Sequence, residues 1–117
     1  MDLQIESTPG SRDDVRVLKL TGPFTLPSVF EFQSTVKGLT DPFVIVDLKD
    51  VPFMDSAALG AIMFLHASLQ KKQHHYAIVG ASDRLRMLFK VTGVDEILVK
   101  YQTRQEAEAA LLNGASS

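Results

Sequence analysis

Short apolar runs alternate along this chain with longer segments in which apolar residues recur every three or four positions. Alternating apolar and polar residues at 3–5 and 15–20 predict two strands, and Pro9–Gly10 between them predicts the turn of a hairpin. The runs FVIVDL at 43–48 and YAIVG at 76–80 are apolar at almost every position, which is typical of parallel strands covered on both faces. The pattern therefore predicts an opening hairpin followed by buried strands.

Helical patterns separate and follow these strands, and residues that cap helix N-termini mark where each helix is expected to begin. A Ser or Thr stands three residues before a Glu, the spacing of a capping box, at the start of the first and the last expected helix. The four expected helices begin at Ser28, Ser56, Ser82 and Thr103, with a short edge strand at 96–101 before the last one. This order predicts an α/β fold: a mixed sheet of four to five strands with about four helices mainly on one side.

The size of the chain suits one compact domain. Its 117 residues, 45% of them hydrophobic, are enough for one core and too few for two ordinary ones. A single domain is therefore expected over residues 1–117, with a disordered tail at 113–117.

Charge and cysteine content exclude several classes of function. The formal net charge is -2 and the charged residues are scattered, so no nucleic acid partner and no membrane-binding patch are expected. There are no cysteines, which excludes disulfides, thiolate catalysis and Cys-based zinc sites. No signal peptide is expected at the start of the chain, and no apolar run reaches the ~18 residues of a membrane span. We therefore expect a cytoplasmic protein without membrane insertion.

The stretch FMDSAALG at 53–60 is the candidate site, because it follows a buried strand and opens a helix. Binding sites gather at the carboxyl ends of parallel strands, and this stretch lies at one of them. Ser56 has two interpretations there. Its hydroxyl can cap the helix, which is the commoner role of a serine at such a place, or it can carry a phosphate at the positive end of the helix dipole.

The helix expected from Ser56 to about Lys72 is apolar almost all the way round in its first half. A helix half open to water normally shows a polar face over the same length. Two interpretations follow: the helix is sandwiched inside the domain, or its N-terminal half offers an apolar patch to a partner, with Met63 as an adaptable contact.

Other chemical candidates are weak. His74 and His75 are adjacent in sequence and lack the spacing of metal ligands, and His66 lies almost three turns from Ser56, too far for a catalytic triad. The carboxylates of Asp47, Asp50 and Asp55 have no glycine-rich phosphate loop beside them and fit a strand end, a turn and a helix start. We therefore expect no enzyme, no metal and no cofactor.

The sequence from residue 44 onward resembles the STAS domain family, and within it the bacterial anti-sigma factor antagonists. The resemblance rests on VDL, FMDS, ALG, the VG before SDRLRMLF, TGVDEIL and an acidic final helix, and it covers almost the whole chain. It implies that Ser56, directly after the aspartate, is phosphorylated by an anti-sigma factor that is a serine kinase. It also implies that the unphosphorylated form binds this kinase, which releases the sigma factor for transcription.

Two segments depart from the pattern of that family. The family motif continues Asp-Ser, Ser or Thr, Gly-Leu-Gly, whereas this chain reads Asp55, Ser56, Ala57, Ala58, Leu59, Gly60. An earlier Gly-Glu-Leu-Asp of the family is matched here by GPFT at 22–25, which has no acid. The residues expected to contact the partner are Asp55, Ser56, Ala57, Leu59, Gly60, Met63 and Thr25.

Three classes of function remain from the sequence. The leading one is an anti-sigma factor antagonist that is switched off by phosphorylation of Ser56. The alternative is a STAS-like subunit that docks on the ATPase of a transporter, or another interaction module that needs no phosphorylation. A small enzyme is the third, and it has no visible pair of nucleophile and base to support it. The sequence predicts no oligomeric state.

Overall fold

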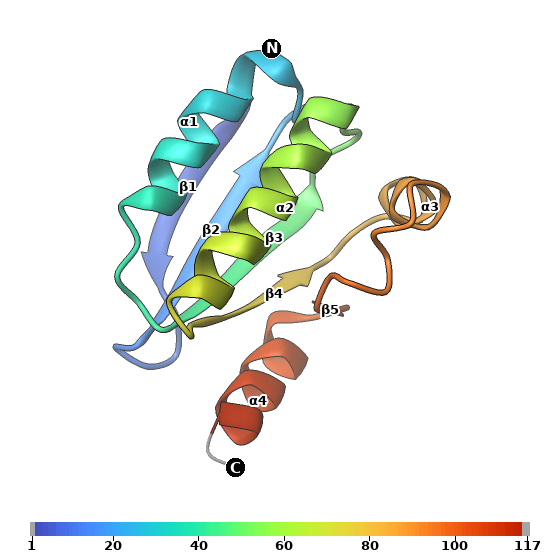
Figure 1. Ribbon diagram of the computed structural model, residues 1–117. Coiled ribbons are helices and arrows are strands. Elements are labelled where there is room, and N and C mark those ends of the chain that lie inside the picture. The colour runs from blue at the N-terminus through green and yellow to red at the C-terminus, as the bar shows by residue number, and fades with distance from the viewer. Residues whose placement is uncertain (1, 116–117) are drawn as a thin grey trace.

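The computed structural model describes residues 2–115 and shows a five-stranded sheet with helices on both faces (Figure 1). The strands are β1 (Gln4–Pro9), β2 (Val15–Thr21), β3 (Phe43–Asp50), β4 (His75–Val79) and β5 (Lys100–Tyr101). The helices are α1 (Leu26–Lys37), α2 (Ser56–Lys71), α3 (Asp83–Val91) and α4 (Arg104–Ala115). The predicted mixed α/β sheet is therefore confirmed.

The strands lie in the sheet in the order in which they occur in the chain. β1 and β2 form the predicted antiparallel hairpin, and β2, β3, β4 and β5 are parallel to their neighbours. Each helical connection returns the chain to the end of the sheet where the strands begin, so the carboxyl ends of the parallel strands lie together at the opposite edge. The segment before Ser56 leaves the sheet at that edge, as the sequence predicts.

Both faces of the sheet are buried, which explains why β3 is apolar at consecutive positions. Val44, Val46 and Leu48 pack in the core shared with α1, α2 and α3, whereas Phe43 and Ile45 pack in a second cluster with α4. Successive strand residues point to opposite faces, so a strand covered on both sides needs apolar residues throughout. Figure 1 shows α1 and α2 side by side on one face, and α4 packs in the second cluster on the other face.

The first helix begins earlier than predicted. α1 starts at Leu26 with Thr25 as the N-cap residue and Pro27 in its first turn, where the missing N–H of proline costs nothing. Ser28 lies inside the helix and is buried, so the capping box expected at Ser28 is wrong. The caps predicted at Ser82 and Thr103 are confirmed, since each side-chain oxygen accepts a backbone N–H three residues later.

The last helix also runs further than predicted. α4 continues to Ala115, into the segment 113–117 expected to be a disordered tail, and residues 116–117 lie outside the described part. Apart from Gly114, the residues at 111–115 tolerate a helix, and one glycine costs only about 1 kcal/mol. Across residues 2–115, every helix falls short of the length and apolarity that crossing a bilayer requires.

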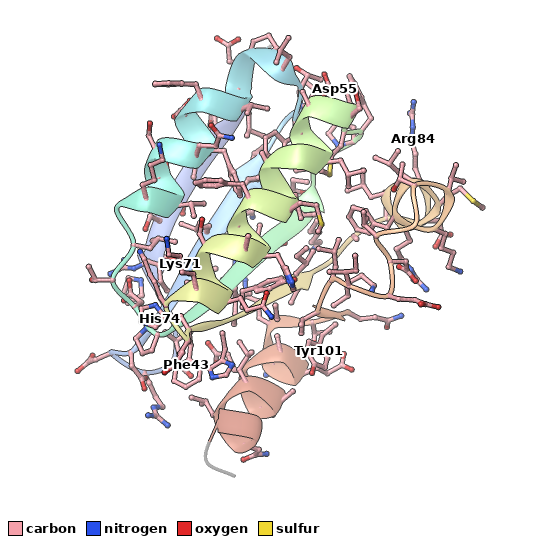
Figure 2. All side chains as sticks on the ribbon, viewed as in Figure 1. Phe43, Asp55, Lys71, His74, Arg84 and Tyr101 are labelled. Carbon is pink, nitrogen blue, oxygen red and sulfur yellow. The ribbon has the colours of Figure 1, made fainter. Side chains whose placement is uncertain are left out.

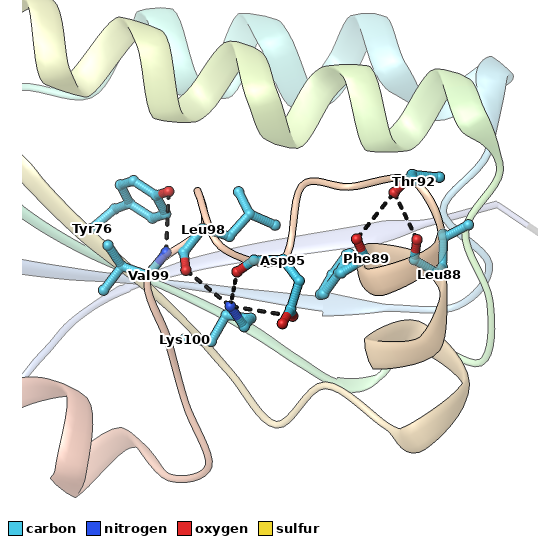
Figure 3. A network of polar contacts seen from close by, with 8 residues as sticks. All are labelled: Tyr76, Leu88, Phe89, Thr92, Asp95, Leu98, Val99 and Lys100. Carbon is cyan, nitrogen blue, oxygen red and sulfur yellow. Dashed lines mark hydrogen bonds and ion pairs between the residues drawn. The ribbon is translucent and has the colours of Figure 1, made fainter.

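The edge strand is much shorter than the predicted 96–101. Residues 94–98 form turns, because the N–H groups of Ile97 and Leu98 both bond the carbonyl of Val94. The ammonium of Lys100 then bonds the carbonyls of Asp95 and Leu98, which ties the turn to the strand that follows (Figure 3). Lys100 and Tyr101 pair with β4, and the carbonyl of Val99 before them accepts the N–H of Ile78.

Candidate functional site

The N-terminus of α2 is held by the carboxylate of Asp55, which is labelled at that end of the helix in Figure 2. Its Oδ1 accepts a hydrogen bond from the N–H of Ala58 at 2.9 Å, and its Oδ2 accepts one from the N–H of Leu26 at 2.9 Å. One side chain therefore caps α2 and also the first turn of α1. The expectation that Ser56 caps α2 is wrong, because Asp55 takes that position and Ser56 is the first helical residue.

The connection that carries Asp55 is fixed by backbone hydrogen bonds. The N–H of Phe24 bonds the carbonyl of Phe53 at 3.1 Å, and the N–H of Asp55 bonds the carbonyl of Phe24 at 3.2 Å. Phe24 and Met54 form an isolated parallel bridge, and both side chains are buried. The segment between β2 and α1 and the segment between β3 and α2 therefore continue the sheet pairing up to the residue before Ser56.

Ser56 is exposed at this end of the molecule. Among residues 2–115, no hydrogen bond uses its hydroxyl, since the cap of α2 is made by the neighbouring aspartate. The N–H groups of Ser56 and Ala57 lie in the first turn, where helical partners do not exist. The hydroxyl is thus accessible, and it lies next to backbone donors at the positive end of a helix of 16 residues.

The other residues expected at the partner surface differ in exposure. Gly60 is exposed with open space beside it, and Ala57 and Thr25 are half-buried. Met63 is half-buried and packs against the core. Leu59 is only 7% exposed and belongs to the core, so the expectation that it offers apolar surface is wrong.

The apolar character of α2 comes mainly from packing inside the domain. Ala58, Leu59, Ala61, Ile62, Leu65 and Leu69 are buried. α1 covers a further part of the helix, where the ammonium of Lys37 lies 5.9 Å from the ring centroid of Phe64. The structure therefore supports the interpretation in which α2 is sandwiched between the sheet and a neighbouring helix.

Sequence reasoning missed three exposed apolar side chains near Ser56. Leu26 is 66% exposed and Phe30, one turn later on α1, is 78% exposed. Phe53, three residues before Ser56, is 39% exposed. Pro27 as a first-turn residue could have placed the start of α1 correctly, and Leu26 and Phe30 would then have appeared four residues apart on one helix face.

A groove of about 870 Å³ opens beside this connection, between the ends of β2 and β3 and the start of α3. Pro23, Val51 and Phe53 supply apolar walls, and Lys49 and Arg84 supply two cations. Apolar walls with a few charged groups suit contact with another molecule at the carboxyl edge of the sheet.

Titratable groups elsewhere in residues 2–115 make contacts within the fold. Within residues 2–115, no group of three His, Asp or Glu side chains is placed to hold a metal ion. His66 Nδ1 lies 2.7 Å from the hydroxyl of Tyr76, and burial raises the pKa of that hydroxyl above its usual value, more than the hydrogen bond from Val99 lowers it. Asp47 is buried and paired with Arg104 at 3.0 Å. These contacts tie elements of the fold together.

Comparison with protein families decides what kind of domain carries this site. Residues 8–107 match the family model of the STAS domain. The chain belongs to the STAS domain family. The start of α2 that carries Ser56 lies inside the matched region, together with the sheet and most of the helices.

Relatives of this STAS domain include named regulatory proteins. It is 31% identical over 100 residues to the anti-sigma-B factor antagonist of Listeria monocytogenes, covering 84% of this chain and 88% of that protein. A putative anti-sigma factor antagonist of Thermotoga maritima has the same fold, with a TM-score of 0.82 at 23% identity over 92% of this chain and 93% of that one. The phosphorylated form of the Bacillus cell fate determinant SpoIIAA matches with a TM-score of 0.68 at 18% identity, over 92% and 97% of the two chains.

Proposed function

We propose that this STAS protein is an anti-sigma factor antagonist. In its unphosphorylated form it binds an anti-sigma factor that is also a serine kinase, and this binding releases the sigma factor. Phosphorylation of Ser56 by the kinase ends the binding. The protein acts in the cytoplasm as one binding domain over residues 1–117 and catalyses no reaction itself. The observation that carries the proposal is the hydroxyl of Ser56, which is exposed at the start of α2 and makes no hydrogen bond among residues 2–115.

The surroundings of Ser56 suit a phosphoryl group. The free N–H groups of the first turn of α2 can donate to its oxygens, and the helix dipole favours a negative charge there. Because Asp55 already makes the cap, modification of Ser56 leaves both hydrogen bonds of that cap in place. The fold is therefore expected to survive phosphorylation, and a comparison structure of phosphorylated SpoIIAA with the same fold supports this expectation.

The exposed apolar side chains explain why phosphorylation would weaken binding. A phosphoserine adds about -1.5 to -2 charges at neutral pH. Leu26 and Phe53 lie in the two segments that the carboxylate of Asp55 and the bridge to Phe24 hold together. A partner that covers these side chains would have to desolvate the phosphate as well, which costs binding free energy.

The departures from the family motif leave the site intact. Ala58 is fully buried, so it packs in the core and presents no surface to a partner. Thr25 serves as the N-cap residue of α1 without a side-chain hydrogen bond, because Asp55 supplies the acceptor for that helix.

The test combines phosphorylation and binding. The purified protein is incubated with ATP and each anti-sigma factor kinase encoded in the same genome, and the modified residue is located by mass spectrometry. We expect one phosphate at Ser56 and none on Ser56→Ala. By calorimetry, Ser56→Ala should still bind, whereas Ser56→Asp should bind at least about tenfold more weakly, or about 1.4 kcal/mol. Ser34→Asp adds the same charge at an exposed serine of the neighbouring helix α1 and is the control. It should bind like the unmodified protein.

Two results would overturn the proposal. A phosphate found only at residues other than Ser56 would contradict the switch. Tight binding to a transport ATPase, together with no binding to any anti-sigma factor, would favour the alternative of a docking subunit that needs no phosphorylation.

A further inference from the structure

A second groove lies between the β3–α2 connection and α3, and its rim keeps large apolar side chains exposed. Phe53 is 39% exposed, Met87 60% and Val91 76%. The groove has a volume of about 330 Å³, and Leu85, Leu88 and Met54 complete its walls. The space is large enough for a bulky side chain of another molecule.

Arg84 lies at the rim of this groove. Its guanidinium is 5.6 Å from the ring centroid of Phe53, which is a cation–π distance. Figure 2 shows the side chain pointing away from α3 into solvent. Within the described part of the chain Arg84 has no carboxylate partner, whereas its neighbour Arg86 lies 3.9 Å from the carboxylate of Asp83.

The charge of α3 favours an acidic partner. Arg84, Arg86 and Lys90 are all exposed on a helix that has Asp83 as its one acidic residue. An arginine held over an aromatic ring keeps its planar fork oriented and loses little conformational freedom when it pairs with a carboxylate. Arginine and aromatic residues around a small apolar pocket are also the residue types that dominate binding energy at interfaces.

We propose that the Phe53–α3 groove binds a segment of the anti-sigma factor in which a large apolar side chain stands next to a carboxylate. The apolar side chain fills the space between Phe53, Met87 and Val91, and the carboxylate pairs with Arg84. This inference rests on the proposed function, since it states the chemistry of the same partner.

The groove also relates to the phosphorylation of Ser56. Phe53 and Ser56 belong to one short connection that is fixed by hydrogen bonds to Phe24 and Leu26. A phosphate on Ser56 would add negative charge near the place that the partner's carboxylate must occupy. Like charges repel, so an acidic recognition segment makes the release of the partner more complete.

The first experiment uses the anti-sigma factor that binds the unmodified protein. Arg84→Gln should weaken binding about tenfold, because one charge-assisted contact is lost. Arg86→Gln, which removes an exposed charge of the same helix that Asp83 already pairs, is the matched control and should weaken binding much less than Arg84→Gln. Val91→Ser should also weaken binding. Raising the NaCl concentration should weaken binding of the anti-sigma factor by the unmodified protein more than binding by Arg84→Gln. If Arg84→Gln and Arg86→Gln bind equally tightly, the inference is wrong while the proposed function stands.

The second experiment needs no anti-sigma factor. The probes are the blocked dipeptides N-acetyl-Phe-Asp-amide and N-acetyl-Phe-Asn-amide, titrated into the protein and followed by NMR. The Asp peptide should shift the Arg84 Nε–H and Met87 methyl signals, and the Asn peptide should shift them much less. Equal shifts with both peptides, or shifts confined to other residues, would contradict the proposal that the Phe53–α3 groove binds an apolar side chain next to a carboxylate. A positive result here with no binding to any anti-sigma factor would overturn the proposed function and support the groove alone.

Discussion

The carboxylate of Asp55 accepts a hydrogen bond from the N–H of Leu26, a residue 29 positions earlier in the chain, at 2.9 Å. Its other oxygen accepts the N–H of Ala58 in the following helix at 2.9 Å. The first turns of α1 and α2 are therefore held side by side by one side chain. Because Asp55 makes the cap, the hydroxyl of Ser56 makes no hydrogen bond among residues 2–115, which leaves it accessible to modification.

The double cap predicts the effect of removing the carboxylate. Asp55→Ala should lower the free energy of unfolding by about 2 kcal/mol, since one N-cap is typically worth about 1 kcal/mol and two helices lose theirs. Asp55→Asn retains an acceptor for α2 and should cost less. Urea denaturation measures both, with Asp83→Ala, an exposed first-turn acid of α3, as the control. An Asp55→Ala variant as stable as Asp83→Ala would contradict the double cap.

Ser56 is predicted to matter little for stability. Because its hydroxyl makes no hydrogen bond among residues 2–115, Ser56→Ala should change the free energy of unfolding by less than about 0.5 kcal/mol. Ser82→Ala removes the oxygen that accepts the N–H of Leu85 and should lower the free energy of unfolding by about 1 kcal/mol. Thermal melts of both variants measure these changes. Equal losses in the two variants would show that Ser56 supports its helix after all.

The Asp47–Arg104 pair is predicted to hold α4 on the sheet. The side chain of Asp47 is 9% exposed and accepts both the Nε–H and the Nη2–H of Arg104 on one oxygen, while its other oxygen accepts the N–H of Lys49. Arg104→Met should cost about 1–3 kcal/mol because a buried carboxylate loses its charged partner. Adding Asp47→Asn to Arg104→Met should restore part of the loss in chemical denaturation. A double variant less stable than either single one would contradict the pairing.

Tyr76 is predicted to make stability fall at high pH. Burial raises the pKa of its hydroxyl above the usual value of about 10, so the unfolded chain ionises first as the pH rises. The contribution of Tyr76 to the free energy of unfolding is fully present below about pH 10. It is lost as the pH rises from that value through the higher pKa of the folded state. Tyr101→Phe leaves Tyr76 as the one tyrosine, so tyrosinate absorbance then reports this group alone. The absorbance should rise above about pH 10 in the folded protein and at lower pH in urea.

The hydrogen bonds of Tyr76 give this prediction a second readout. Its hydroxyl lies 2.7 Å from His66 Nδ1 and accepts the N–H of Val99 at 3.4 Å, the contact drawn in Figure 3. Tyr76→Phe should remove the loss of stability at high pH, at the cost of these two contacts at every pH. Identical absorbance titrations in buffer and in urea would show that burial does not act on this group.

The local pattern of the sequence was enough for the order and type of the elements. Continuous apolar runs identify β3 and β4 because each strand is buried on both faces, and cap residues identify the starts of α3 and α4 because those caps act within a few residues. The FMDS segment also indicated the candidate site, since a strand end followed by a helix start can be recognised from neighbours in the chain. The STAS family followed from the same segments.

Only the tertiary structure could decide which residues of the candidate site are exposed. The apolar helix pattern predicts Leu59 at the surface, but in the fold it is 7% exposed and belongs to the same core cluster as residues of the sheet and of α3. From the sequence, Ser56 is a plausible cap of its helix. In the fold, Leu26 lies next to Asp55, 29 residues later in the chain, and the carboxylate of Asp55 caps the first turns of both helices. The groove that joins Phe53 to Arg84 and Val91 likewise depends on packing between segments that are distant in the chain. Periodicity and capping act over a few residues, whereas exposure and long-range hydrogen bonds are properties of the assembled fold.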